Sequence, residues 1–171
     1  MFVRNLLRSV FLAAAIGVLA MPAARADEEP PLVLQESPTL LQQASASVEE
    51  TLDKALDLIG IRYRRGGMTP ERGFDCSGFV NHVFREGLGL YLPRSAKEMS
   101  RTGEAVAMGD LKPGDLVFFN TMRRTFSHVG IYLGDNLFVH APRTGGRVRV
   151  EDMNTRYWVK RFNGARRVAE L

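Results

Sequence analysis

The chain has 171 residues and a formal net charge of +4 at pH 7, from 23 Lys and Arg against 19 Asp and Glu. Three of the arginines lie in residues 1–26, so the rest of the chain is close to neutral and lacks the basic excess of a nucleic-acid-binding domain. Residues 27–171 are enough for one domain with an ordinary hydrophobic core. The composition therefore predicts a single globular domain with no nucleic-acid partner.

The N-terminus has the pattern of an export signal. Arg4 and Arg8 precede an apolar core at 10–21, and Ala24-Arg25-Ala26 offers a small-x-small cleavage site. The core is shorter than the roughly 20 residues that a membrane-spanning helix needs, so an uncleaved anchor is the weaker alternative. Since the residue directly after the cleavage site is Asp27 and not a cysteine, we expect a soluble periplasmic protein without a lipid anchor or integral membrane segment.

The folded part of the chain is expected to begin near residue 47. Residues 27–46 are acidic and then contain Pro, Gln and Ser, which indicates a flexible leader. Ser47 and Glu50 then match a capping box, and the helix that they start is expected to stop near Gly60. We therefore predict a signal peptide at 1–26, a leader at 27–46 and a folded domain at 47–171.

Cys76 is the only cysteine in the chain, and it stands at the start of a second predicted helix that runs to about Glu86. Asp75 is the expected N-cap, and Cys76 shares a helix face with Phe79 and Val80, so the thiol should point toward the body of the domain. A thiol at a helix N-terminus favours the thiolate, a nucleophile when a histidine reaches it. The alternative is a small buried core residue.

The second half of the chain alternates between apolar segments and turn signals. Beyond a short helix at 96–102, strands are expected at 116–119, 128–133, 137–141, 147–151 and 162–168. Helices followed by a run of antiparallel strands make an α+β fold.

His128 and His140 fall in two of these strands, which form a predicted hairpin. A three-residue turn at 134–136 places His140 opposite Gly130, where the absent side chain leaves room between the histidines. They are then diagonal neighbours on one face, with Cα atoms roughly 7–8 Å apart. A two-residue turn would put them on opposite faces. The predicted pair suits a relay in which His128 takes the proton of Cys76 and His140 orients His128.

Two other interpretations of these residues stay open. Cys76 with both histidines could bind Zn²⁺, but the set supplies only three ligands. The two histidines could also be unrelated packing residues. The third histidine, His82, falls opposite the apolar stripe of its helix and is expected at the surface.

The chain resembles the NlpC/P60 family of cell-wall cysteine peptidases over about residues 47–168. The resemblance rests on several motifs in order along the chain. They are Tyr63-Arg64-Arg65-Gly66-Gly67, Phe74-Asp75-Cys76-Ser77-Gly78-Phe79-Val80, Leu92-Pro93-Arg94-Ser95, Pro113-Gly114-Asp115-Leu116-Val117-Phe118-Phe119, Ser127-His128-Val129-Gly130-Ile131-Tyr132-Leu133-Gly134 and Phe138-Val139-His140-Ala141.

The resemblance implies a papain-like α+β catalytic domain in which the cysteine helix packs on a small antiparallel sheet. By position, Cys76 would be the nucleophile, His128 the base and His140 the orienting third member. Tyr63 would help to hold the oxyanion together with the backbone N–H of Cys76. The implied chemistry needs no metal or cofactor.

The resemblance also implies the substrate. Asp75 and Ser77 match positions that line the substrate groove, and Arg65 and Arg94 could meet the carboxylates of peptidoglycan stem peptides or could be solvated surface residues. The chain looks most like the single-domain murein endopeptidases of Gram-negative bacteria, which cut the cross-link between diaminopimelate and D-alanine. The bond between D-glutamate and diaminopimelate is the second choice, and no regulatory or adaptor partner can be specified.

Two alternatives to this activity remain. The domain could be a non-catalytic wall-binding or regulatory module, although its complete set of Cys76, His128 and His140 argues against that. It could also be an amidase or acyltransferase, because a fold and a triad do not determine the substrate.

Overall fold

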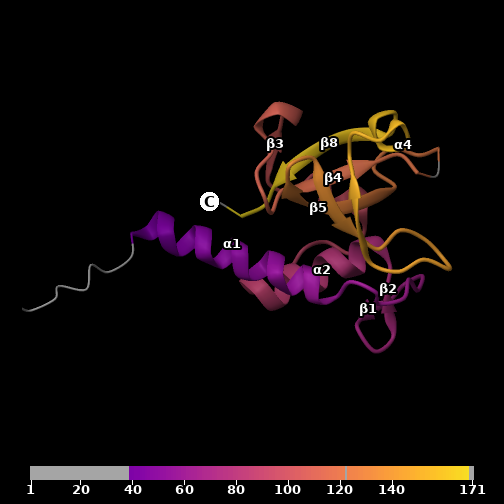
Figure 1. Cartoon of the computed structure of the whole chain (residues 1–171), viewed down its shortest axis with the longest axis horizontal. Helices are drawn as coiled ribbons and strands as arrows, with labels where there is room; N and C mark the ends of the chain where they lie inside the picture. Colours follow the sequence, from indigo (N-terminus) through magenta and orange to yellow (C-terminus); the bar gives the residue numbers. More distant parts are fainter. Residues whose placement is uncertain (1–38, 122, 170–171) are drawn as a thin grey trace, which may run out of the picture. The chain divides into compact units, whose positions relative to one another are not determined.

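The computed structural model describes residues 39–121 and 123–169 (Figure 1). The predicted signal peptide and residues 27–38 of the predicted leader lie outside the described residues. Within the described ranges, no helix combines the length and the apolar character needed to cross a membrane.

The first helix, α1 (Leu40–Asp57), begins earlier than predicted. Thr39 is its N-cap, with Oγ1 accepting from the backbone N–H of Gln42 at 3.3 Å and the backbone N–H of Thr39 donating to Gln42 Oε1 at 2.8 Å. The predicted capping box at Ser47 is wrong, because its hydroxyl donates to the carbonyl of Gln43 at 2.9 Å inside the helix. Residues 40–46, which we expected in the leader, are helical.

The second helix, α2 (Cys76–Leu88), begins where the sequence predicts and ends two residues later than predicted. Gly89, with φ of 64°, is its left-handed C-cap, and its N–H donates to the carbonyl of Arg85 at 3.0 Å. Gly87, the predicted stop, lies within the helix, where a Cβ would sit 2.3 Å from Thr51 Oγ1. That glycine allows α1 and α2 to approach each other.

The strands form a six-stranded sheet in the order β3-β8-β4-β5-β6-β7, with every neighbouring pair antiparallel. Its strands are β3 (Glu104–Val106), β4 (Leu116–Phe119), β5 (His128–Gly134), β6 (Leu137–His140), β7 (Arg149–Asp152) and β8 (Phe162–Arg167). A separate two-stranded sheet pairs β1 (Met68–Thr69) with β2 (Gly73–Phe74). The fold is the α+β arrangement that the sequence predicts, with β3, β1 and β2 as additions that were too short to detect.

The large sheet carries buried side chains on both faces, and α1 and α2 lie along one of them (Figure 1). One face packs with α1 and α2 in a core that includes Phe79, Val83, Phe118 and Ile131. The other face carries a smaller aromatic core around Phe119, Phe138 and Trp158, the last from the short helix α4 (Arg156–Val159). Odd-numbered residues of β5 face α2 and even-numbered residues face Trp158, so the first residue of β5, His128, belongs to the Trp158 side.

Candidate active site

Cys76 is placed by the N-cap of α2, as predicted. Oδ1 of Asp75 accepts from the backbone N–H of Gly78 at 2.7 Å, which starts the helix at Cys76. Cys76 is half-buried and packs against the core beside α2. The inward-facing side chain expected from helical spacing is therefore confirmed.

The predicted preference for the thiolate is wrong for the protein without substrate. Burial, followed by the negative charge of Asp75, raises the pKa of the Cys76 thiol to about 11. Backbone N–H groups of Val129, Ser77 and Cys76 itself lower the pKa, but by less. The thiol is therefore protonated at neutral pH, so its reaction requires a base.

The hairpin of β5 and β6 has the predicted register but a different turn. Ile131 pairs with Val139, and Tyr132 with Phe138, as the predicted alignment requires. Asp135 and Asn136, with φ of 49° and 61°, make a two-residue turn rather than the three-residue turn that we expected. A register shift between Tyr132 and Gly134 inserts one extra residue in β5, and this bulge keeps both histidines on one face.

The two histidines are in direct contact. His128 Nε2 lies 2.7 Å from His140 Nδ1, and the two residues are 2% and 0% exposed. The absence of a side chain at Gly130 makes this possible, since a Cβ there would lie 2.6 Å from Phe138 Cδ2 and 3.2 Å from His140 Cβ. Their contact supports the predicted relay over the alternative of unrelated packing residues.

Burial also sets the charge state of the histidines. It lowers the pKa of His128 well below its usual range, and the neighbouring His140 acts in the same direction. Burial lowers the pKa of His140 as well, against the opposing effect of Glu151. Both rings are neutral at pH 7. Because Nε2 of His128 is hydrogen-bonded to His140, Nδ1 of His128 is the nitrogen that can accept a proton.

Cys76 and His128 line one groove, which also contains Tyr63 and Trp158. Burial, followed by the charges of Cys76 and Asp75, raises the pKa of Tyr63, so its hydroxyl stays protonated and can donate a hydrogen bond. The structure therefore brings the predicted nucleophile, base and oxyanion donor to the same groove. Their roles remain predictions.

The predicted substrate-binding residues form a network on the helix side of the groove. Arg94 donates to both oxygens of the Asp75 carboxylate, at 3.0 and 2.7 Å, and to Ser77 Oγ at 2.9 Å. The backbone N–H of Gly66 donates to Asp75 Oδ2 at 2.9 Å and so ties the glycine-containing loop to the helix. Arg65 is exposed at the groove and outside this network. Whether these residues bind substrate stays a prediction.

Two residues of the site, Trp158 and Glu151, were not predicted from the sequence. The Trp158 ring stacks on His128, with centroids 5.8 Å apart and planes at 21°, and lies edge-on to His140 at 5.2 Å. Glu151 Oε1 lies 3.8 Å from His140 Nε2. Trp158 could have been noticed as the single tryptophan of the chain, whereas Glu151 carries no comparable signal.

The structure also bears on the predicted position of His82 and on the alternative of a metal site. His82 is half-buried rather than fully at the surface, because its ring packs 5.1 Å from that of Phe74. No three side chains of His, Cys, Asp or Glu within 39–121 and 123–169 are grouped in a way that could hold a metal ion.

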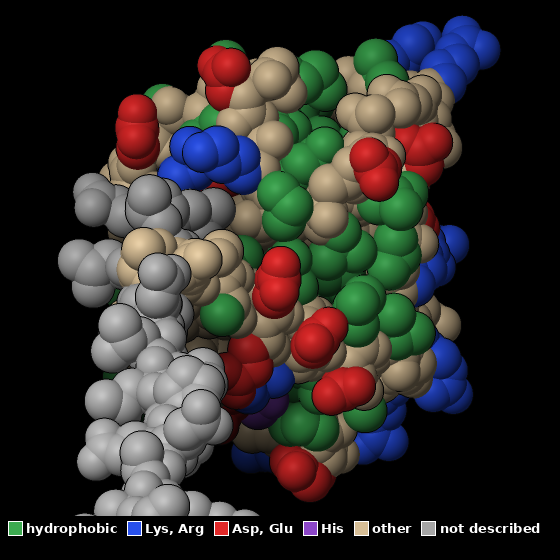
Figure 2. All heavy atoms as spheres, turned by 60° about the vertical axis from the view of Figure 1, so that its left-hand side comes forward, with side chains coloured by type: hydrophobic (Ala, Val, Ile, Leu, Met, Phe, Trp, Pro, Cys, Tyr) green, Lys and Arg blue, Asp and Glu red, His purple; other side chains and the backbone are tan. Residues whose placement is uncertain are grey.

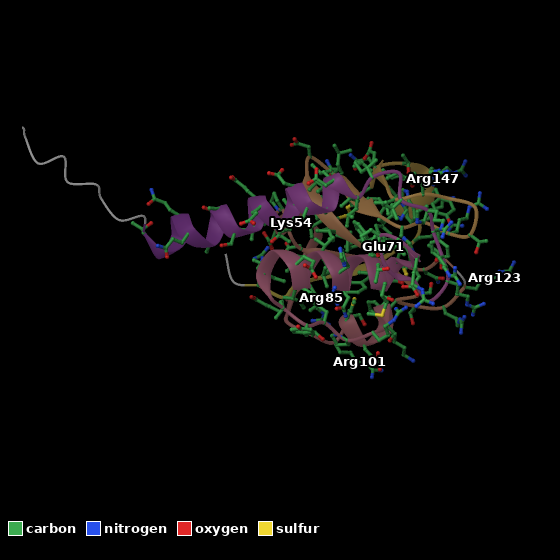
Figure 3. The ribbon with its side chains drawn as sticks, turned by 90° about the horizontal axis from the view of Figure 1, so that it is seen from below. Lys54, Glu71, Arg85, Arg101, Arg123 and Arg147 are labelled. Atoms are coloured by element: carbon green, nitrogen blue, oxygen red, sulfur yellow. The ribbon has the colours of Figure 1, made fainter. Side chains whose placement is uncertain are left out.

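The rim of the groove is rich in cations. Its acidic residues, Asp75 and Glu151, are each paired with an arginine, Arg94 and Arg149. The further cations that line it are Arg65, Lys97, Arg123, Arg124 and Arg143. Arg123 lies at the end of the domain remote from the start of α1 (Figure 3).

Comparison with known proteins identifies a family and several relatives. The model of the NlpC/P60 family matches residues 60–167. The murein DD-endopeptidase MepS/murein LD-carboxypeptidase of Escherichia coli K12 is 50% identical over 117 residues, which are 68% of this chain and 61% of that protein. The gamma-DL-glutamyl hydrolase of Bacillus subtilis 168 is 44% identical over 121 residues, 70% of this chain and 29% of that protein. The chain thus spans less than two thirds of these relatives.

Solved structures of similar fold include two NlpC/P60 domains. A family protein from Bacillus cereus ATCC 10987 superposes with a TM-score of 0.68 at 31% identity, over 72% of this chain and 40% of that one. The NlpC/p60 domain of the peptidoglycan hydrolase SagA gives 0.61 at 29% identity, over 72% of this chain and 98% of that one. The predicted fold is therefore confirmed.

Proposed function

Because the chain belongs to the NlpC/P60 family, we propose that it is a cysteine peptidase that hydrolyses an amide bond in peptidoglycan stem peptides or their cross-links. The observation that carries the proposal is the buried contact of His128 with His140, at 2.7 Å, in the groove that Cys76 also lines. A neutral base and a protonated thiol in the same groove are the groups that a nucleophilic mechanism requires.

The reaction begins when His128 removes the proton from Cys76 and the sulfur attacks the carbonyl carbon of the substrate amide. The oxyanion that forms accepts hydrogen bonds from the backbone N–H of Cys76 and from the hydroxyl of Tyr63. The imidazolium of His128 then gives its proton to the leaving amine, and a thioester remains on Cys76. His128 next removes a proton from water, which attacks the thioester, releases the acid product and restores the thiol.

The charge of the groove supports an acidic substrate. Five of its cations have no acidic partner among the groove residues, and stem peptides carry carboxylates that such cations attract. The opposite end differs, since Figure 2 shows Asp and Glu scattered over the face where α1 begins, with Lys and Arg mostly near its edge. Of the stem-peptide bonds, the cross-link between diaminopimelate and D-alanine is our first choice and the bond between D-glutamate and diaminopimelate our second.

This substrate implies that the protein works outside the cytoplasm. Residues 1–26 have the pattern of an export signal, so we propose that the chain is exported to the periplasm. Arg65, Arg94, Asp75 and Ser77 are the residues that we propose to contact the stem peptide.

To test the proposed activity, the purified protein is incubated with isolated sacculi and the released muropeptides are identified by mass spectrometry. We expect disappearance of cross-linked species and appearance of their uncrosslinked halves. The Cys76→Ala variant should release none of them. Equal release by that variant would contradict the mechanism, binding without release would indicate a wall-binding module, and separation of glycan from whole peptides would indicate an amidase.

A further inference from the structure

The second nitrogen of His140 faces a carboxylate that the proposed mechanism does not use. His140 is fully buried, and its Nε2 has no hydrogen-bond partner among residues 39–121 and 123–169. Glu151 Oε1 lies 3.8 Å away, longer than a hydrogen bond but within the range of an ion pair. In the pairing of β6 with β7, His140 lies opposite Arg149, so Glu151 is its diagonal neighbour on the same face.

Glu151 is held in this place from two directions. Trp158 Nε1 donates a hydrogen bond to Oε2, and Arg149 Nε donates one to Oε1. The side chain of Glu151 is 24% exposed, whereas that of Arg149 is 50% exposed. The tryptophan that packs on the ring of His128 is thus also the residue that orients the carboxylate facing His140. Trp158 therefore contacts both Glu151 and the histidine pair.

The hydrogen bonds of the pair determine where its protons must be. For His128 to accept a proton at Nδ1, its Nε2 must carry a hydrogen and donate it to His140 Nδ1. His140 Nδ1 is then without a proton, so Nε2 of His140 carries one. Glu151 Oε1 lies 3.8 Å from this nitrogen. The negative charge of the carboxylate attracts the N–H and disfavours the opposite tautomer, which would present a lone pair to that charge.

We infer that Glu151 is a positioning residue of this site, a fourth member of the chain that runs from Cys76 through His128 and His140. Its carboxylate fixes the tautomer of His140 and thereby that of His128, and it stabilises the imidazolium that forms when His128 takes the proton of the thiol. The charged or titratable groups that face His140 are His128 from β5 and Arg149 and Glu151 from β7. The inference concerns the mechanism of the proposed peptidase and rests on that function for its kinetic part.

The kinetic experiment compares Glu151→Gln with the wild type on the same muropeptide substrate. The partner that orients a metal-ligating histidine contributes about 10- to 100-fold to activity, and we expect kcat/KM to fall by a similar factor here. Since the charge of Glu151 raises the pKa of both histidines, its loss should also move the acid limb of the pH profile to lower pH. Glu151→Asp should recover part of the lost kcat/KM, and its acid limb should lie closer to that of the wild type. Glu104→Gln, an exposed strand glutamate, is the matched control.

A second measurement is independent of turnover. In ¹⁵N-histidine-labelled Cys76→Ala protein, the imidazole nitrogens should show His140 protonated at Nε2 and His128 at Nε2. Adding Glu151→Gln should populate the other tautomer of His140. An unchanged tautomer together with unchanged kcat/KM and pH profile would overturn the inference even if the protein is an active peptidase. If no muropeptide is cleaved, the proposed function fails, and the tautomers still decide whether Glu151 positions His140.

Discussion

The two sides of the groove are built from different interactions. On the sheet side, His128 and His140 are almost completely buried among the rings of Phe119, Phe138 and Trp158. On the helix side, the side chains of Asp75 and Arg94 are 14% and 41% exposed and are held by charge-assisted hydrogen bonds. Burial keeps the two histidines of the sheet side neutral, and the partly solvated ion pair keeps the helix side charged.

This difference matches two tasks of the proposed hydrolase. A base must be unprotonated before it can accept a proton, and burial keeps an imidazole neutral because it lowers the pKa. A surface that must recognise carboxylates benefits from charges that water still reaches, because desolvation of an unpaired charge is costly. We therefore expect substitutions on the sheet side to act on the rate and on packing, and substitutions on the helix side to act on the thiol and the ion pair.

The largest effect should follow from removal of the base. His128→Ala leaves the protonated Cys76 thiol without an acceptor, so we expect muropeptide release to slow by about 10³-fold, within the range of general-base contributions. Initial rates on isolated sacculi measure this, with circular dichroism to check that the variant is folded. A loss of less than tenfold would mean that another group deprotonates Cys76.

The next effect tests the close packing of the sheet side. In Gly130→Ala the new Cβ would lie 2.6 Å from Phe138 Cδ2 and 3.0 Å from the carbonyl of Val139, so β5 and β6 must move apart. Such overpacking costs about 1–3 kcal/mol in the free energy of unfolding, which urea titration measures. Gly109→Ala is the matched control, since a Cβ at Gly109 meets no atom within 4 Å. Equal losses in the two variants would contradict the packing argument.

The histidine pair was predictable because the residue pattern constrains the strands more strongly than the turn does. Val129 and Ile131 must face α2, and this alternation puts His128 on the other face whatever the turn may be. The turn itself was predicted wrongly, because a bulge cannot be recognised from the residues of a single chain. The start of α1 was also predicted wrongly. Ser47 is a residue type that commonly caps helices, but here its hydroxyl donates to the carbonyl of Gln43 inside the helix.

The position of Glu151 beside His140 and the protonation state of the Cys76 thiol could not have been predicted in the same way. The connection from β6 to β7 spans residues 141–148 and has no short turn that determines which residue of β7 lies beside His140. The raised pKa of the Cys76 thiol depends on burial by the folded domain, whereas the helix N-terminus that favours the thiolate is visible in the sequence. Local features are encoded in short segments, and burial is a property of the whole domain.

A smaller effect should appear on the helix side in Asp75→Asn. Asparagine can still cap α2, but the ion pair with Arg94 is lost, and at this exposure we expect a cost of about 1 kcal/mol or less. The charge of Asp75 raises the pKa of the Cys76 thiol, so its loss should lower that pKa from about 11. Alkylation by iodoacetamide as a function of pH measures the change, with Asp53→Asn on α1 as the control. An unchanged alkylation profile would show that Asp75 has no electrostatic effect on the thiol.

The smallest effect is a pH dependence of stability that comes from the sheet side. The folded-state pKa of His128 lies well below 6.5, so below pH 6.5 the unfolded chain binds a proton that the folded chain does not, and stability falls as pH falls. For one histidine that stays neutral when folded, linkage gives a loss of about 0.7 kcal/mol between pH 7 and pH 6. Urea titrations of Cys76→Ala at both pH values measure the loss, and adding His128→Ala should reduce it. If the double variant lost as much stability as Cys76→Ala, the buried neutral base would not be its source, and the contrast between the two sides of the groove would lose its electrostatic basis.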